Sequence, residues 1–342
     1  VPAGQQPWVI RLSPDDTKVF VACDISNTVE VFDLVTGDHE LTIDDFPIGI
    51  SSFGFNSENG RNTVTFSNFE ITPDGAYLIA GDWEDSLLFF NTTTGAVDHI
   101  IAGLGDVRFV ALSGDGTTAV VFTVGANPAV VYQIDLSSYS VTSSVTVTGH
   151  SISMAYEIGV NYDGSKAFIG ISGNESAIVR FSTNDFVTFS STYTPFWIGT
   201  SPDHDLAISG QYRFSIIDFN SETMLGQYQG NSQYSGAVSP VDARAVGFDA
   251  YRHEGIYFYD YTNTSPPTYR GTTESGLAPE GDAPRRIAMT PDGSKAVVAN
   301  VLSDNITIVD LDALVIDTVI EDCGERVQNV AATSDGQWAV AC

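Results

Sequence analysis

Arginines and aromatic residues at the start of successive apolar segments are the residues of this sequence best suited to bind a ligand. The arginine side chain offers a planar fork of donors that fits carboxylate, sulfate or phosphate groups, and aromatic faces stack on sugars or on the arginines themselves. Their recurrence at one position predicts a site for an anionic or carbohydrate ligand. The candidate residues are Trp8, Arg108, Tyr156, Trp197, Tyr234, Arg285 and Arg286.

Residues spaced for catalysis or metal binding are scarce. The five histidines lie far apart in the sequence and are too few for a multi-copper or haem site. No G-x-S-x-G segment stands between a strand and a helix, so a hydrolase nucleophile turn has nowhere to form. Acid pairs such as Asp310 and Asp312 fit strand ends and lack the spaced ligands of a calcium loop. We predict no catalytic residue, no metal site and no cofactor, leave calcium binding open, and lean against an enzyme without excluding one.

Two sets of residues could be covalently modified. The three cysteines, Cys23, Cys323 and Cys342, form an odd set without the CxxC spacing of a zinc ribbon. A disulfide between two of them suits an oxidising compartment, and the sequence does not choose the pair. The N-x-S/T pattern, which arises easily by chance in a chain rich in serine and threonine, predicts a glycoprotein with acceptors at Asn91, Asn174, Asn263 and Asn305.

The balance of charges limits the partners of this acidic protein. The net charge is -29, from 43 acidic and only 14 basic residues, of which three are lysine. Nucleic acids and anionic membranes need a basic surface, so we expect neither as a partner.

No apolar run approaches the roughly 18 residues of a membrane span. A chain that opens at VPAG without methionine predicts a removed leader, and hence an extracellular or cell-surface protein.

The elements that must position the candidate residues are β-strands in a repeated unit. In residues 287–312, IAMTPDGSKAVVANVLSDNITIVDLD, runs of alternating β-branched residues are separated by turn residues, which is typical of consecutive antiparallel strands. Pro291 fixes the first corner position, Asp292 can accept hydrogen bonds from the following amides, and Gly293 suits the left-handed conformation that closes a hairpin. Similar corners recur as SPDD at 13, TPDG at 72, SGDG at 113, NYDG at 161, SPDH at 201, SPVD at 239 and TSDG at 333.

The repetition predicts an all-β fold, a single β-propeller of four-stranded antiparallel blades. Corners spaced by about 38 to 59 residues have the period of propeller blades, and repetition from end to end indicates one closed ring over residues 1–342. Seven repeats look complete and the eighth stops inside its second strand, so we slightly favour eight blades over seven. The repeats lie near 6–49, 63–105, 106–150, 153–195, 196–232, 233–282 and 283–324, with a partial repeat at 325–342.

Two repeats carry a resemblance to a known family. Residues 7–37, PWVIRLSPDDTKVFVACDISNTVEVFDLVTG, and residues 284–313, PRRIAMTPDGSKAVVANVLSDNITIVDLDA, are similar to the YVTN-type β-propeller repeat of surface-layer and other exported proteins. The likeness covers nearly the whole chain, although the fourth to sixth copies keep only the strand pattern. It implies an exported propeller that serves as a scaffold, as a binding module or, in lactonase-type relatives, as an enzyme.

The function expected from these features is that of a non-enzymatic extracellular or cell-surface propeller, a structural, adhesive or ligand-binding scaffold. The alternative is a lactonase-like hydrolytic propeller with a site in the channel mouth. Expected partners are other surface proteins, further copies of the chain, glycans or small anions. In a propeller the candidate arginines and aromatics fall at the channel mouth, on the face opposite the corners. A competing interpretation has these arginines neutralise local aspartates while the aromatics plug the channel.

The innermost strands also predict how neighbouring blades pack. Large apolar residues alternate there with one position that is small in six of eight copies, so that bulk from one blade can fill the space left in the next. The residues at this position are Arg11, Glu70, Ala111, Gly159, Gly199, Ala237, Ala288 and Ala331. Because the two exceptions carry opposite charges in adjacent blades, we predict an ion pair between Arg11 and Glu70 near the channel.

Overall fold

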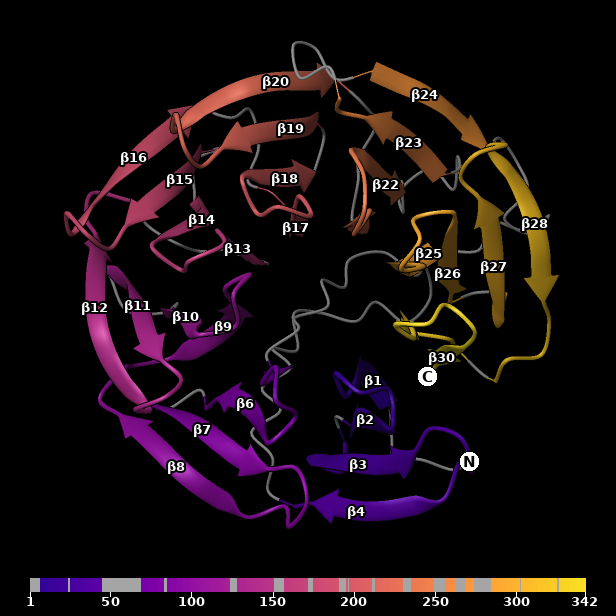
Figure 1. Ribbon diagram of the computed structural model, residues 1–342, viewed down its shortest axis with the longest axis horizontal. Helices are drawn as coiled ribbons and strands as arrows, with labels where there is room; N and C mark the ends of the chain where they lie inside the picture. The colour runs from indigo at the N-terminus through magenta and orange to yellow at the C-terminus, as the bar shows by residue number, and fades with distance from the viewer. Residues whose placement is uncertain are drawn as a thin grey trace.

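The chain folds as a ring of antiparallel sheets around a common centre (Figure 1), which is where β-propellers have their channel. In each sheet, strands that follow one another in sequence also pair with one another, so the sheet is a meander that runs outward from the channel. The chain is therefore a β-propeller, as predicted. The computed structural model describes residues 7–23, 25–44, 69–82, 85–123, 128–150, 157–171, 175–190, 195, 197–210, 213–229, 235–248, 256–262, 268–273, 284–301, 303–324 and 326–342.

The strands are grouped by blade, in chain order. Blade 1 contains β1 (Pro7–Leu12), β2 (Lys18–Cys23), β3 (Thr28–Asp33) and β4 (His39–Ile43); blade 2 contains β5 (Phe69–Ile71), β6 (Tyr77–Gly81), β7 (Ser86–Asn91) and β8 (Val97–Ala102). Blade 3 contains β9 (Val107–Leu112), β10 (Thr118–Thr123), β11 (Ala129–Asp135) and β12 (Ser140–Val147); blade 4 contains β13 (Ile158–Val160), β14 (Lys166–Ile171), β15 (Glu175–Arg180) and β16 (Asp185–Ser190). Blade 5 contains β17 (Trp197–Thr200), β18 (Leu206–Gly210), β19 (Arg213–Asp218) and β20 (Thr223–Gln229); blade 6 contains β21 (Ser235–Val238), β22 (Arg244–Phe248), β23 (Ile256–Asp260) and β24 (Thr268–Thr273); blade 7 contains β25 (Pro284–Met289), β26 (Lys295–Asn300), β27 (Asn305–Asp310) and β28 (Val315–Ile320).

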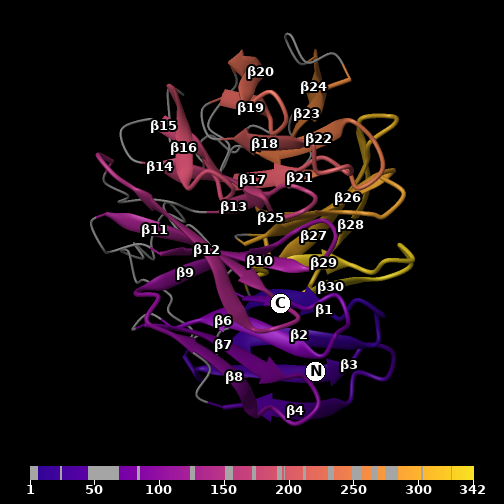
Figure 2. The ribbon, with the colours of Figure 1, turned by 60° about the vertical axis from the view of Figure 1, so that its left-hand side comes forward.

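The described chain forms seven four-stranded blades, so the slight preference for eight was wrong. The last corner folds instead as a two-stranded sheet of β29 (Val330–Ala332) and β30 (Ala339–Ala341), because a single strand follows that corner. We call residues 327–342 the C-terminal hairpin. It lies between blade 7 and blade 1, and Figure 2 shows β29 and β30 stacked above β1.

The corners between the first two strands share one hydrogen-bonded design in six of the seven blades and in the C-terminal hairpin. The corner of blade 6 departs from it, because Val241 stands where the others have aspartate. In the corner of blade 1, the Ser13 hydroxyl donates to Asp15 (2.6 Å) and accepts from the Lys18 backbone N–H (2.9 Å), while Asp15 accepts from the Thr17 backbone N–H (3.1 Å). The fourth residue of the corners that share this design adopts a positive φ, which is 67° for Gly293 and 57° for His204, the residue that replaces glycine in blade 5. The predicted turn chemistry is therefore confirmed for these corners and not for that of blade 6.

Corner aspartates make the fold sensitive to acid. Hydrogen bonds from Thr290 and Ser294 lower the pKa of Asp292 to about 2, and hydroxyl donors likewise lower the pKa of Asp15 and Asp335. A lowered pKa means that each carboxylate stabilises the fold above the pKa of about 3.9 that aspartate has in the unfolded chain. That contribution is lost as the pH falls from there through the folded value.

We therefore expect the urea midpoint of unfolding to fall as the pH is lowered from about 4 to about 2. Asp292→Asn keeps an acceptor oxygen but cannot titrate, so its midpoint should fall less steeply over this range than that of the unchanged chain. Asp38→Asn, at an exposed carboxylate outside the corners, is the matched control. Parallel pH profiles for the two variants would contradict this role of the corners.

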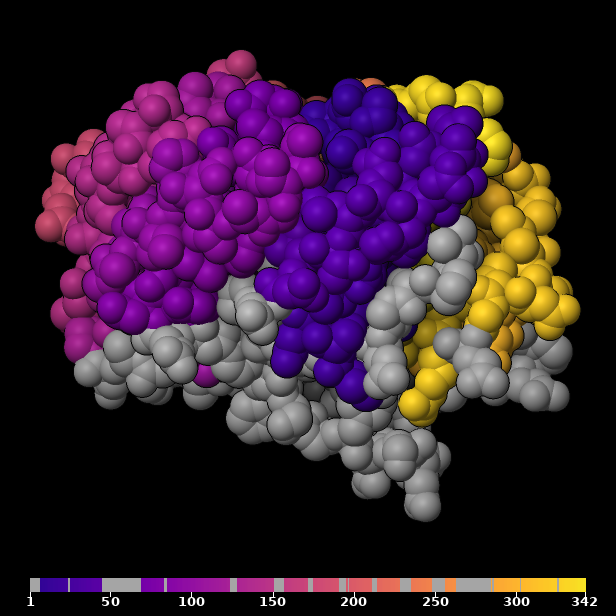
Figure 3. Space-filling view, turned by 90° about the horizontal axis from the view of Figure 1, so that it is seen from below, coloured from indigo at the N-terminus to yellow at the C-terminus, as the bar shows by residue number. Residues whose placement is uncertain are grey.

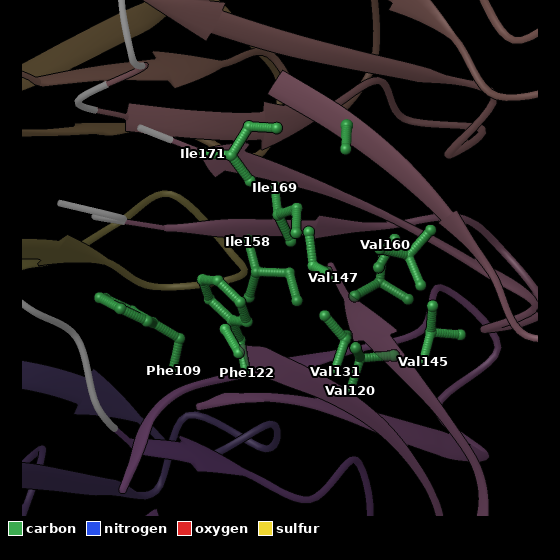
Figure 4. Packing of buried hydrophobic residues seen from close by; sticks show 14 of the residues in the cluster. Phe109, Val120, Phe122, Val131, Val145, Val147, Ile158, Val160, Ile169 and Ile171 are labelled. Atoms are coloured by element: carbon green, nitrogen blue, oxygen red, sulfur yellow. The ribbon is translucent and has the colours of Figure 1, made fainter. Parts of the chain in front are cut away.

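Neighbouring blades interlock through the small residues of their innermost strands. A β-carbon added at Gly159 would lie 2.9 Å from Cγ2 of Ile198 in blade 5, and one added at Gly199 would lie 2.7 Å from Cγ2 of Val238 in blade 6. Figure 4 shows the apolar layer between blades 3 and 4, where Phe122 and Val131 lie opposite Ile158 and Ile169. The predicted alternation of bulk and space between blades is therefore confirmed, and the remaining small residues that pack against such clusters are Ala111, Ala237, Ala288 and Ala331.

The first and last segments of the chain meet and close the ring. Figure 3 shows the first blade in indigo between the second blade in purple and C-terminal residues in yellow. The Ser334 backbone N–H donates to Oδ2 of Asp16 over 2.6 Å, which joins the last corner to the first. The predicted ion pair is also present, since Nη2 of Arg11 lies 3.4 Å from Oε1 of Glu70, and the Arg11 guanidinium lies over the Phe69 ring at 5.6 Å.

Candidate functional site

The predicted mouth residues stand at the inner ends of four different blades. Trp8 lies in β1, Arg108 in β9, Trp197 at the start of β17 and Arg286 in β25. These four side chains are described. Tyr156 and Tyr234 lie outside the described residues, and Arg285 is described only as part of the backbone of β25.

Arg286 forms an ion pair that spans the channel. Its Nη1 lies 3.0 Å from Oε1 of Glu157, the residue directly before β13. Because blades 5 and 6 separate blade 7 from blade 4 in the ring, these two side chains meet within the channel. The second carboxylate oxygen of Glu157 accepts a hydrogen bond of 2.7 Å from the Ile198 backbone N–H. One carboxylate therefore ties together the inner ends of blades 4, 5 and 7.

Arg108 is paired with a carboxylate next to it in sequence. Its Nε donates to both oxygens of Asp106 at 3.1 Å, and its Nη2 donates to Oδ2 at 2.8 Å. A planar guanidinium and a planar carboxylate fit each other in this two-point geometry. The Arg108 guanidinium, which could bind a ligand carboxylate or phosphate, is thus bound by Asp106 of the same chain.

The two tryptophans of the predicted mouth are packed between blades. Trp8 belongs to a cluster that joins blades 1 and 2, together with Phe20 and Phe69. Trp197 is 1% exposed and covers Gly236 of blade 6 so closely that an added β-carbon there would lie 2.4 Å from its ring. Neither ring offers an open face on which a sugar could stack.

The described arginines are paired with carboxylates, as the competing interpretation expects, but the described tryptophans pack between blades and do not plug the channel. The ligand-binding role of the seven residues stays a prediction. The alignment of repeats could not pair Glu157 with Arg286, because the two residues are 129 positions apart. Asp106 was detectable, because it precedes Arg108 by two residues and adjacent side chains on one face of a strand are two residues apart.

The described residues contain no group of three or more histidine, cysteine, aspartate or glutamate side chains that could hold a metal ion. A cavity of about 10 Å³ lies between blades 6 and 7, among Val246, Phe258 and Leu311, away from the mouth. That volume is about the space that one water molecule needs. That the chain uses no cofactor stays a prediction from the sequence.

Two of the four predicted glycosylation acceptors lie among the described residues. The Asn91 amide donates to Asp98 over 3.0 Å at the end of β7. Asn305 is 1% exposed, and its amide nitrogen, to which a glycan would be attached, donates to Oε2 of Glu321 over 3.2 Å. Asn174 and Asn263 lie outside the described residues. Of the described pair, Asn91 is the more accessible.

Comparison with known proteins places the chain in a class of fold. No family model and no curated protein matches the sequence. The C-terminal WD40 domain of Sif2 matches with a TM-score of 0.72 and 12% identity, over 98% of this chain and 93% of that one. Hydrazine synthase of Kuenenia stuttgartiensis matches at 0.61 and 14% (100% and 94%), and the β-propeller domain of Cps50 (Swd1) of Myceliophteria thermophila at 0.60 and 10% (82% and 93%).

These similarities show the propeller fold alone, because all the identities lie below 15%. The class that fold and comparisons define is that of β-propellers. The resemblance to YVTN-type repeats stays a prediction within that class. Among the described residues, no helix is long and apolar enough to cross a membrane.

Proposed function

We propose that this chain is a non-catalytic, exported propeller that acts as a scaffold and binds partner proteins of the cell surface. The observation that supports the proposal is that the described mouth residues make their contacts with other residues of the protein. Arg286 and Glu157 brace three blades, Arg108 is held by Asp106, and Trp197 fills the space between blades. Such contacts stabilise a ring and leave its outer faces free for binding.

The corner face of the ring is the surface that we assign to this binding. In an antiparallel meander the first and third connections lie at the same end of the sheet, so both sets of turns share one face. Large apolar side chains stand exposed on it: Val35 is 82% exposed, Trp338 64%, Tyr162 57% and Val241 56%. Aromatic side chains on a rigid backbone are typical anchors of protein interfaces.

The proposed location rests on the sequence. The net charge of -29 with three lysines argues against nucleic acids and anionic membranes as partners. The resemblance to repeats of surface-layer and other exported proteins favours partners at the cell surface, including further copies of the chain. A structural or adhesive role follows from such partners.

A binding experiment tests the proposal. Fluorescently labelled chain should bind saturably to intact cells of the organism that produces it, and the variant Tyr162→Ser, Val241→Ser, Trp338→Ser should lose at least about 90% of that binding, since anchor truncations commonly cost 2 kcal/mol or more. The matched control removes exposed apolar residues of the outermost strands, with the changes Val97→Ser, Ile100→Ser and Val141→Ser, and should bind as the unchanged chain does.

Three outcomes would overturn the proposal. The first is native protein found in the cytosolic fraction, and the second is binding that the corner-face variant retains. The third is hydrolysis of lactones by the unchanged chain that Glu157→Gln abolishes, because that result would make the channel mouth an active site.

A further inference from the structure

The seam between the C-terminal hairpin and blade 1 contains two cysteines. Cys23 ends β2 and is fully buried. Cys342 follows β30, and its backbone is fixed by hydrogen bonds in both directions with Asn329, including one of 3.1 Å from its own N–H to the Asn329 carbonyl. Both cysteines therefore have a defined place, on opposite sides of one interface between sheets.

The two thiols face the same layer of side chains. Cys23 packs with Val19 and Val21 of its own strand, and Val340 and Cys342 pack against this cluster from the hairpin. The alternation of side chains along a strand agrees with this, because Val340 and Cys342 are two residues apart and so share a face. Burial and the nearby Cys23 thiol raise the pKa of Cys342 to about 12.

The third cysteine lies on the other side of the hairpin. Cys323 packs against the cluster of Val297 and Ala299 in blade 7, as does Ala341. Ala341 and Cys342 are adjacent in sequence, so they point to opposite faces. The hairpin thus separates Cys323 from Cys342, and the choice among three pairs that the sequence left open is reduced to one.

We propose that Cys23 and Cys342 form a disulfide bond that covalently closes the ring when the protein meets a disulfide oxidant. In the first step a thiolate of the pair attacks oxidised glutathione, which releases one reduced glutathione and leaves a mixed disulfide. The second thiol then loses its proton, attacks that mixed disulfide and releases a second reduced glutathione. Two protein thiols are oxidised, and one glutathione disulfide is reduced to two thiols.

The raised pKa of Cys342 predicts how the reaction depends on pH. The thiolate is the attacking species, and a thiol whose pKa is raised by burial is almost entirely protonated near pH 7. Oxidation should therefore be slow at neutral pH and should accelerate as the pH rises toward 9. The raised pKa slows the reaction but does not fix its end point, which depends on the reduction potential of the cysteine pair relative to that of glutathione.

The test uses the full chain of 342 residues. After incubation with oxidised glutathione, thiol titration in denaturant should fall from three thiols to one, and proteolysis with mass spectrometry should recover residues 23 and 342 in one linked peptide pair. Cys323→Ser should form the same bond. Cys342→Ser should not, and it should keep the melting temperature of the reduced chain, whereas oxidation should raise that of the unchanged chain by roughly 3 to 8 °C.

Either of two results would overturn the proposal. One is a linked peptide pair that contains Cys323. The other is the persistence of three thiols, or of glutathione adducts without a protein disulfide, after oxidation at pH 9. Both results are independent of what the propeller binds, so this test and the cell-binding test fail separately.

Discussion

Gly199→Val will destabilise the propeller by about 2 to 3 kcal/mol. Gly199 lies on the inner strand of blade 5, and its missing side chain leaves the space that Val238 of blade 6 occupies. Even a β-carbon would stand 2.7 Å from Cγ2 of Val238, a distance that real β-carbons essentially never show. Valine adds two further methyl groups, and overpacking a close-packed interior usually costs about 1 to 3 kcal/mol, occasionally more. Urea unfolding followed by fluorescence measures the loss.

The double variant Gly199→Val, Val238→Ala distinguishes this clash from a general intolerance of changes in blade 5. Truncating Val238 removes the methyl group that the new side chain would meet, so the double variant should be more stable than the sum of the two single changes predicts, by about 1 kcal/mol or more. Additive effects would show that the blades do not interlock at this contact.

Glu157→Ala will lower the free energy of unfolding by about 2 to 4 kcal/mol. The change removes the carboxylate from the Arg286 guanidinium, which is 15% exposed, and removes the acceptor of the Ile198 backbone N–H. Breaking one side of a largely buried ion pair is costly because the other charge stays out of water, and an orphaned buried donor adds about 1 to 3 kcal/mol. Thermal and urea unfolding measure the effect.

Glu157→Gln is the matched variant for this contact. Its amide oxygen can still accept from Ile198, but it carries no charge, so its stability should lie between those of the unchanged chain and Glu157→Ala. Adding Arg286→Met to Glu157→Ala should restore part of the loss, since no guanidinium then remains. If the free energies of unfolding of both Glu157 variants stayed within about 0.5 kcal/mol of that of the unchanged chain, the ion pair between Glu157 and Arg286 would not stabilise the fold.

Local patterns in the sequence predicted the parts of the fold that depend on neighbours in the chain. The corner at Thr290, Asp292 and Gly293 follows from turn chemistry within four residues. The contact between Arg11 and Glu70 also followed, because equivalent positions in successive repeats must lie side by side. Repetition turns a long-range contact into a comparison between aligned residues, and that is why these predictions were confirmed.

Contacts across the channel could not be predicted in this way. Arg286 and Glu157 belong to blades that are not adjacent, and no alignment of repeats states which residues meet at the centre. The direction of the Trp197 side chain could not be predicted either, since a tryptophan beside a channel can point inward or between sheets. It points between sheets because Gly236 leaves space for its ring in blade 6. The blade count was wrong because eight corners do not require eight complete sheets.

The bond between Ser334 and Asp16 has a consequence for how the protein is made. These residues are 318 positions apart, so a ribosome that adds about 5 to 20 residues per second delivers the second roughly 15 to 60 seconds after the first. During that interval the face of blade 1 that carries Val19, Val21 and Phe32 has no neighbour. This apolar surface stays uncovered during synthesis, so aggregation of nascent chains is expected to begin at blade 1.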